Sequence, residues 1–193
     1  MITRLFLVRH GPTHAKSMVG WSDIPADLSD TLALARLDSF LPDNALVVSS
    51  DLIRAEHTAD AIQGARQRLP HMPALREIHF GAWELRTWTE VNEEDPERIR
   101  AYWEQPGDST PPGGESWNEV RARVDTAIDT LISRHAGRNL IVTGHFGQIL
   151  TQIQRAGGLT AAEAFSNKID NLSVSEVLHG PDGWETGRIN HLP

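Results

Sequence analysis

Short apolar runs that alternate with segments of helical periodicity are the strongest constraint on the fold of this chain. Runs rich in Leu, Ile and Val predict buried strands over residues 3–8, 45–48 and 139–145. Apolar residues at helical spacing predict helices over residues 28–41, 51–67, 116–135 and 147–157. Strands that alternate with helices in this way join as parallel neighbours. We therefore predict an α/β fold, a three-layer α/β/α sandwich around a mostly parallel central sheet.

Local signals predict where several of these elements begin and end. Ser50 is the predicted N-cap of the second helix, where its hydroxyl would accept a hydrogen bond from the first turn. Ser116 begins a capping box with Glu119 at the start of the third helix. After that second helix we expect a short extended piece that reaches Leu75, and we expect the last two strands to form a hairpin that turns at residues 181–183.

The segment 84–115 has no clean period and is rich in proline and glycine. We interpret it as an insertion of short helices and loops that forms a cap over the sheet. The chain of 193 residues, 1–193, is then a single domain that includes this insertion. Between Glu84 and Glu119 the sequence holds ten carboxylates and three arginines, so this stretch accounts for −7 of the net charge of −8.

Composition excludes several classes of function. The chain has no cysteine, which excludes disulfides, thiolate zinc sites and a cysteine nucleophile. A net charge of −8 argues against a general nucleic-acid surface, because binding to a phosphate backbone needs clustered Lys and Arg. The apolar run Leu5–Val8 is far shorter than the core of a signal peptide or a membrane span. We therefore expect a soluble, cytoplasmic protein that binds neither nucleic acid nor membrane.

Polar side chains follow the predicted strands at their carboxyl ends. Arg9 and His10 follow the first strand, Arg54 lies one turn into the helix after the second, and His145 ends the third. Because the carboxyl ends of parallel strands share one edge of a sheet, we expect these four side chains to converge. Two guanidiniums and two imidazoles suit an anion whose charge is spread over several oxygens. A phosphoryl group meets this description better than a carboxylate does.

The chain carries the motifs LVRHG, SSDLIRAEHTA, LREIHFGAWE, GGES and IVTGHFG, in this order, between about residue 3 and residue 150. Each is similar to a motif of the histidine phosphatase superfamily, which is also called the phosphoglycerate mutase-like family. A lone RHG tripeptide is a weak signal, whereas the ordered set is specific. By this resemblance the chain is identified as a member of the phosphatase branch of that family.

The resemblance implies a catalytic role for each matched residue. His10 would be the nucleophile that forms a phosphohistidine, and Glu77 would be the general acid and base. Arg9, Arg54 and His145 would hold the phosphoryl oxygens, and His145 would also belong to the catalytic group. No metal ion and no other cofactor is implied, since the cationic cluster supplies the charge that Mg²⁺ supplies in other phosphoryl-transfer enzymes.

The chain departs from the family pattern next to two of these residues. Lys16 stands where many members have an asparagine, so a cation replaces a neutral phosphate donor. Phe146 stands where a glycine commonly follows the second histidine, and its backbone N–H is expected to donate to phosphate while its ring narrows the pocket. Thr13 is a further expected phosphate donor. We include all three among the predicted phosphate-binding residues.

Two local alternatives compete with this assignment. His10 and His14 are four residues apart and could share a metal ion, but that spacing binds metals on a helix, and Pro12 excludes a helix here. Glu84 lies seven residues after Glu77 and is the rival general acid.

We expect hydrolysis of a small phosphomonoester. A cofactor-dependent phosphoglycerate mutase is the first alternative, and the acidic charge of residues 84–119 opposes the second anionic group of its substrate. A catalytically silent module that binds a phosphorylated ligand is the second, and retention of the nucleophile, the second histidine and the acid opposes it. The FGAWE stretch is similar to that of the alpha-ribazole phosphatase branch, so a nucleoside-like 5′-phosphate is one candidate substrate. The expected partner is a small phosphorylated metabolite, and a homo-oligomer is left open.

Overall fold

A computed structural model describes residues 1–193 and contains one six-stranded sheet in the order β3-β2-β4-β1-β5-β6. The strands are β1 (Thr3–Arg9), β2 (Ala45–Ser49), β3 (Gln67–Arg68), β4 (Asn139–Gly144), β5 (Val174–Gly180) and β6 (Gly183–Thr186). The first four are parallel to one another, whereas β5 runs antiparallel to β1 and β6 antiparallel to β5. The predicted α/β fold with a mostly parallel sheet is therefore confirmed, as is the hairpin that turns at residues 181–183.

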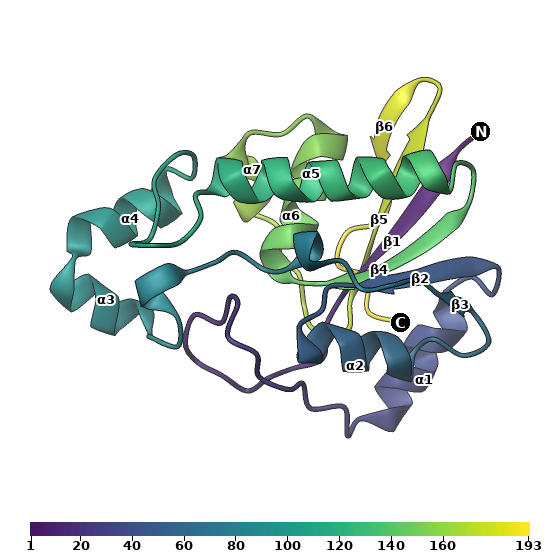
Figure 1. The fold of residues 1–193 in the computed structure, drawn as a ribbon, viewed down its shortest axis with the longest axis horizontal. Helices are drawn as coiled ribbons and strands as arrows, with labels where there is room; N and C mark the ends of the chain where they lie inside the picture. Colours follow the sequence, from purple (N-terminus) through teal and green to yellow (C-terminus); the bar gives the residue numbers. More distant parts are fainter.

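Helices cover both faces of this sheet (Figure 1). They are α1 (Thr31–Phe40), α2 (Ile53–Ala61), α3 (Trp88–Glu94), α4 (Pro96–Glu104), α5 (Trp117–Arg134), α6 (Phe146–Gly157) and α7 (Ala161–Phe165), with two 3₁₀ turns, η1 (Pro73–Leu75) and η2 (Gly81–Trp83). Helices α5, α6 and α7 lie on one side of the sheet and α1 and α2 on the other (Figure 1). No helix combines the length and the apolarity that crossing a membrane would require.

Each face of the sheet buries its own apolar cluster. In β1, Leu5 and Leu7 belong to the larger cluster, which includes residues of α5 and α6. Phe6 and Val8 point to the opposite face and belong to the smaller cluster with residues of α1 and α2. Because side chains alternate between the two faces of a strand, a continuous apolar run is required wherever both faces are covered. The short apolar runs of the sequence thus specify a sheet between two layers of helices.

The start of α2 differs from the prediction. Ser50 is not its N-cap: the helix begins at Ile53 after Leu52, which makes no side-chain capping bond. The Ile53 N–H instead donates to Asp23 Oδ1 at 2.7 Å, so a distant loop supplies the cap. The Ser50 hydroxyl lies 2.7 Å from Nε2 of His145. Ser50 Oγ therefore makes a tertiary hydrogen bond, and its local one is to the N–H of Leu52 at 3.3 Å, before the first helical residue.

Several other boundaries also differ from those predicted. Helix α2 ends at Ala61 rather than at residue 67, because Gly64 adopts a positive φ of 53° that a right-handed helix excludes. The extended piece expected before Leu75 is the 3₁₀ turn η1. The short strand β3 and the five-residue helix α7 were not predicted, since both are too short to show a period. The capping box of Ser116 and Glu119 at α5 is confirmed.

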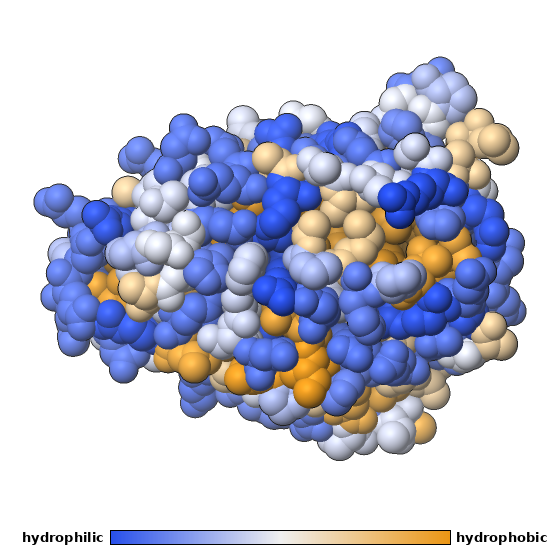
Figure 2. Space-filling model, viewed as in Figure 1, coloured by the Kyte–Doolittle hydropathy of each residue, from blue (hydrophilic) through white to orange (hydrophobic).

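Residues 84–115, predicted to be a cap of short helices and loops, form α3 and α4 and the loops around them. These helices extend the molecule beyond the sheet (Figure 1), and the surface over them is mostly hydrophilic (Figure 2). Val91, Ile99 and Tyr102 anchor them to the larger apolar cluster. That the chain is a single domain with this segment as an insertion stays a prediction.

A buried arginine joins the ends of α1 and α2. The Arg66 side chain is 4% exposed and donates to the carbonyls of Leu41 and Pro42 at 2.8 Å and of Ile62 at 2.9 Å, and it also pairs with Asp38. The carbonyls of Leu41 and Ile62 belong to the C-cap residues of α1 and α2, where the helix supplies no donor, whereas that of Pro42 also accepts from the N–H of Ala45 at 3.3 Å. Arg66 therefore fixes the end of α2, whose first turn carries Arg54.

We expect Arg66→Ala to lower the free energy of unfolding by about 3 kcal/mol, because several buried carbonyls lose their donor. For a chain of this size the loss corresponds to a melting temperature lower by roughly 6–12 °C. Differential scanning calorimetry would measure it. Arg134→Ala is the control, since that side chain is exposed in the last turn of α5, and a loss of similar size in both variants would contradict the assignment.

Candidate active site

Arg9 and His10 are held at the carboxyl end of β1 by backbone hydrogen bonds. The His10 N–H donates to the carbonyl of Gly144 in β4 at 3.0 Å, and the Leu172 N–H donates to the carbonyl of Arg9 at 3.0 Å. Asn171 donates from Nδ2 to the carbonyl of His10 at 2.7 Å. Contacts from β4 and from the segment 171–172 thus fix the point at which the two side chains leave the sheet.

The environment of the His10 ring determines both its tautomer and its charge. Nδ1 lies 2.7 Å from the carbonyl of Gly11, which can only accept, so Nδ1 carries the proton and Nε2 keeps a free lone pair. The residue is 6% exposed. Burial, followed by the charge of Arg54, lowers the pKa of His10 to about 3, and Arg9 adds to this effect while the hydrogen bond to Gly11 opposes it. His10 is therefore a neutral imidazole at pH 7.

The two guanidiniums of the site donate only to backbone carbonyls. Arg54 is 1% exposed and donates to the carbonyls of Gly20 at 2.6 Å and Ser22 at 2.9 Å. Arg9 donates to the carbonyl of Ile169 at 2.5 Å, and its buried Nε has no partner. Burial lowers the pKa of both arginines, and the charge of nearby Glu77 opposes that effect. Their positive charge is therefore not neutralised by a bound carboxylate.

His145 lies against His10, with ring centroids 5.2 Å apart, and is completely buried. Its Nε2 lies 2.7 Å from Oγ of Ser50, an oxygen that also accepts from the N–H of Leu52 at 3.3 Å. We assign the hydroxyl proton of Ser50 to the bond with Nε2, which places the imidazole proton on Nδ1, an atom that is buried without a partner. Burial, then the charge of Arg54, holds the pKa of His145 well below its usual value. His145 thus presents an unused N–H donor.

Glu77 lies between the turns η1 and η2 with its carboxylate against the start of α6. Its Oε1 accepts from the N–H of Ile78 at 3.0 Å and from the N–H of Gly147 at 2.9 Å. Burial raises the pKa of Glu77, although both hydrogen bonds and the charges of Arg54 and Arg9 oppose it. A Cβ at position 147 would lie 2.5 Å from Oε1, so only glycine allows this approach.

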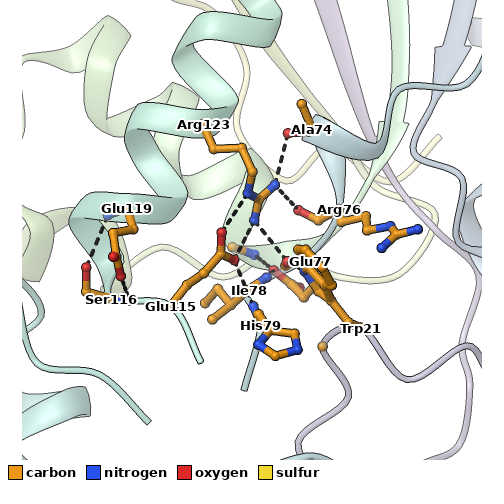
Figure 3. Close-up of polar contacts among 12 residues, drawn as sticks. Trp21, Ala74, Arg76, Glu77, Ile78, His79, Glu115, Ser116, Glu119 and Arg123 are labelled. Atoms are coloured by element: carbon orange, nitrogen blue, oxygen red, sulfur yellow. Dashed lines mark hydrogen bonds and ion pairs between the residues drawn. The ribbon is translucent and has the colours of Figure 1, made fainter. Parts of the chain in front are cut away.

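The backbone of Glu77 is held by a network that sequence analysis missed (Figure 3). The carbonyl of Glu77 accepts from Nη2 of Arg123 at 3.1 Å and from Nε1 of Trp21 at 2.9 Å. Arg123 also pairs with Glu115 at 2.7 Å, and Glu115 accepts from the N–H of His79 at 3.0 Å. Helix α5 and the end of the 84–115 segment therefore hold the peptide that carries the acid. Arg123 is one of several charged residues on the amphipathic helix α5, so no signal in the sequence singled it out.

The three remaining predicted phosphate-binding residues, Lys16, Thr13 and Phe146, differ in how close they lie to the cluster of arginines and histidines. The Lys16 side chain is exposed in the loop after β1, and Thr13 is half-buried in the same loop. Phe146 begins α6, and its ring lies beneath the guanidinium of Arg9, with Cζ of Arg9 5.5 Å from the ring centroid. The structure therefore brings Phe146 to the cluster and leaves Lys16 at the surface.

The two local alternatives are resolved by their contacts. His14 is exposed, and its Nε2 lies 2.8 Å from Oδ2 of Asp27, whereas His10 is buried. Glu84 accepts hydrogen bonds from Phe80 and from the turn at residues 20–22 rather than reaching the histidines.

The arrangement as a whole can bind an anion and transfer a group from it. It combines one buried and one half-buried guanidinium, an unused imidazole N–H and a neutral imidazole with a free lone pair. The carboxyl group beside them has a raised pKa. A phosphoryl group needs donors for three oxygens, a nucleophile and a proton donor, and the cluster contains each of them.

Comparison with known sequences gives the same family. The chain matches the histidine phosphatase superfamily (branch 1) over residues 5–192. It is 32% identical over 203 residues to a protein of Mycobacterium tuberculosis that is described as bifunctional. The alignment covers 97% of this chain and 53% of that protein. The chain therefore spans about half the length of the first curated relatives it matches. It is also 30% identical to the adenosylcobalamin/alpha-ribazole phosphatase of Escherichia coli K12, over 90% of this chain and 89% of that protein.

Comparison with solved structures agrees. The fold is similar to that of YhfR from Bacillus stearothermophilus, with a TM-score of 0.89, 28% sequence identity, and coverage of 99% of this chain and 98% of the other. Family match, sequence relatives and fold agree with the five ordered motifs and with the geometry at the end of β1. The chain belongs to the histidine phosphatase superfamily.

Proposed function

We propose that the protein hydrolyses a small phosphomonoester through a phosphohistidine formed on His10. The observation that carries the proposal is the state of that ring. Its Nδ1 is tied to the carbonyl of Gly11, and its pKa is depressed, so Nε2 is an unprotonated nucleophile beside two arginines that bind only carbonyls. Both the E. coli relative's name and the family support a phosphatase rather than a binding module.

In the first step Nε2 of His10 attacks phosphorus, and the bond from phosphorus to the leaving oxygen breaks. Arg9, Arg54 and the Nδ1–H of His145 donate to the three equatorial oxygens. Glu77, in its acid form, gives its proton to the leaving oxygen. In the second step Glu77 takes a proton from the attacking water, the bond between nitrogen and phosphorus breaks, and inorganic phosphate leaves.

The substrate we propose carries one phosphoryl group and no second anion. Beyond Arg9 and Arg54, two neighbouring cations are engaged, since Arg76 binds Asp51 and Arg86 binds Glu94, whereas Lys16 is exposed and has no ion-pair partner. Three carboxylates of residues 84–119, those of Glu84, Glu115 and Glu119, already accept internal hydrogen bonds. The segment therefore repels a second anionic group less strongly than its net charge implies. Three arginines against ten carboxylates in residues 84–119 nonetheless oppose binding of the remote anionic end of a phosphoglycerate. A nucleoside-like 5′-phosphate is the candidate that the name of the E. coli relative favours.

The proposed reaction needs no metal and no cofactor, because the two arginines supply the charge that stabilises the transferring group. We also propose that the protein acts in the cytoplasm on a free metabolite, without nucleic-acid or membrane partners.

We expect turnover of para-nitrophenyl phosphate in EDTA, and we expect His10→Ala to lower kcat by at least about 10³-fold, because the covalent route is lost. His57→Ala is the matched control, since that histidine is exposed on α2. Rapid alkaline quench and intact-protein mass spectrometry should detect one phosphoryl group on the parent only. Equal activity in the His10 variant would contradict the proposal.

Two assays separate the alternatives. Formation of 2-phosphoglycerate from 3-phosphoglycerate in the presence of 2,3-bisphosphoglycerate would favour the mutase. Phosphate binding without turnover on any phosphomonoester would favour the silent module.

Glu77→Gln should separate the two steps. Glutamine keeps the oxygen that accepts from Ile78 and Gly147 but cannot transfer a proton. Nitrophenolate leaves without protonation, so we expect a burst of one product equivalent followed by slow hydrolysis of the phosphoenzyme. Alkyl phosphates need the acid in the first step, and kcat should fall by about 10²–10⁴-fold without a burst. Stopped-flow absorbance would measure the burst. If Glu84→Gln produces it instead, Glu84 is the acid.

The pH dependence follows from two shifts of opposite sign. Because the pKa of His10 is lowered to about 3, its nucleophilic form is fully present above about pH 4 and is lost only as pH falls through the folded-state value. Because the pKa of Glu77 is raised, its acid form is lost as pH rises through that value. We expect kcat/KM for an alkyl phosphate to fall on the alkaline side. NMR titration of the imidazole protons should show no titration of His10 near pH 6.5, and titration there would contradict its assigned state.

A further inference from the structure

Glu84 is saturated with hydrogen bonds although it lies outside the proposed phosphoryl site. Its Oε1 accepts from the N–H groups of Trp21 at 2.7 Å and Phe80 at 3.1 Å. Its Oε2 accepts from the N–H groups of Gly20 at 3.1 Å and Ser22 at 3.2 Å and from Oγ of Ser22 at 2.6 Å. Five donors exhaust the acceptor capacity of a carboxylate. Three consecutive peptide N–H groups thus converge on one side chain.

The same turn binds Arg54 through its carbonyls. Gly20 accepts from Nη2 at 2.6 Å and Ser22 accepts from Nη1 at 2.9 Å. These are the two hydrogen bonds that orient the Arg54 guanidinium, and the residue is 1% exposed. The turn at residues 20–22 therefore lies between Glu84 on its N–H side and Arg54 on its C=O side.

Two further contacts tie this turn to its surroundings. Asp23, the next residue, accepts from the N–H of Ile53 at the start of α2, one residue before Arg54. A Cβ at position 20 would lie 2.0 Å from the carbonyl oxygen of Ile78 and 2.4 Å from Oε1 of Glu84, so the turn fits here only because residue 20 is glycine. The packing leaves the turn little freedom while its hydrogen bonds are intact.

We propose that Glu84 is a positioning residue that sets the orientation of the Arg54 guanidinium through the turn at residues 20–22, and that it thereby controls affinity for the phosphoryl group. The inference rests on the proposed function, in which Arg54 holds phosphoryl oxygens. Removing the carboxylate leaves three converging N–H groups without an acceptor, so the turn must rotate to find other partners. Rotation moves the two carbonyls, and Arg54 has no carboxylate to keep its fork in place.

The protonation state of Glu84 agrees with this role. Burial alone would raise its pKa, but the hydrogen bonds from Ser22, Trp21, Phe80 and Gly20 outweigh burial and hold the pKa of Glu84 below its usual value. Glu84 therefore stays ionised at neutral pH, as an acceptor of five donors must.

A double-mutant cycle between Glu84 and Arg54 tests the proposal. Calorimetric titration with inorganic phosphate would be run on the parent protein, Glu84→Gln, Arg54→Lys and the double variant. Glutamine places an NH₂ group against one set of donors, so we expect Glu84→Gln to weaken phosphate binding about tenfold. Lysine lacks the planar guanidinium that binds both carbonyls. In the Arg54→Lys background, Glu84→Gln should therefore weaken phosphate binding by less than about twofold.

Control variants isolate the effect from a general loss of structure. Glu163→Gln removes another carboxylate that accepts from a backbone N–H and a hydroxyl, those of Thr160, and phosphate affinity should not change. Near-ultraviolet circular dichroism would report folding of each variant. If Glu84→Gln does not fold, the cycle is run with Glu84→Asp, which keeps the charge but is one methylene too short to reach both sets of donors, and a few-fold loss restricted to the Arg54 background is expected.

Equal losses in both backgrounds, or no loss in either, would overturn the positioning role. The alkaline limb of the alkyl-phosphate profile should be the same in Glu84→Gln as in the parent protein, and its disappearance would make Glu84 the acid instead. Phosphate binding needs no turnover, so the two proposals fail separately. If the parent protein binds phosphate but hydrolyses no phosphomonoester, the proposed function fails, and the coupling between Glu84 and Arg54 can still be measured. If the parent protein hydrolyses a phosphomonoester but the cycle shows no coupling, only the positioning role fails.

Discussion

The rest of the site depends on two guanidiniums, that of buried Arg54 and that of half-buried Arg9, which donate hydrogen bonds only to backbone carbonyls. Burying a cation is costly unless polar groups replace its water shell, and the carbonyls of Gly20, Ser22 and Ile169 do so for Arg54 and Arg9. Dipoles stabilise the cations without cancelling their charge, as a carboxylate would. The loops that present these carbonyls are therefore as much a part of the site as the arginines themselves.

The positive charge of Arg9 and Arg54 influences the pKa values of a neighbouring base, His10, and of a neighbouring acid, Glu77. It adds to burial at His10, and the pKa of that imidazole falls to about 3. It opposes burial at Glu77, where burial prevails and the pKa rises. A neutral nucleophile beside a carboxyl group with a raised pKa is the combination that the proposed two-step hydrolysis requires. Environment, rather than residue type, thus separates the two roles.

Residues at strand ends were predictable, whereas residues that act through tertiary contacts were not. Arg9, His10 and His145 follow apolar runs directly, so strand topology alone predicted their convergence. Ser50 had the right residue type and position for a helix cap, yet it binds His145. The role of Arg123 in holding the peptide of Glu77 had no local signal, because Arg123 is one of several charged residues on an amphipathic helix.

The sequence by itself determined the α/β layering and the edge of the sheet at which the polar groups meet, because both follow from the spacing of apolar residues within a few positions of one another. The tertiary structure alone decided which polar atoms pair. Ser50 and His145 are separated by 95 residues, and Gly20 and Glu84 by 64. No local period encodes such a pair, since either partner has nearer polar groups to bind. Only packing of the loops onto the sheet brings the distant partner within hydrogen-bond distance.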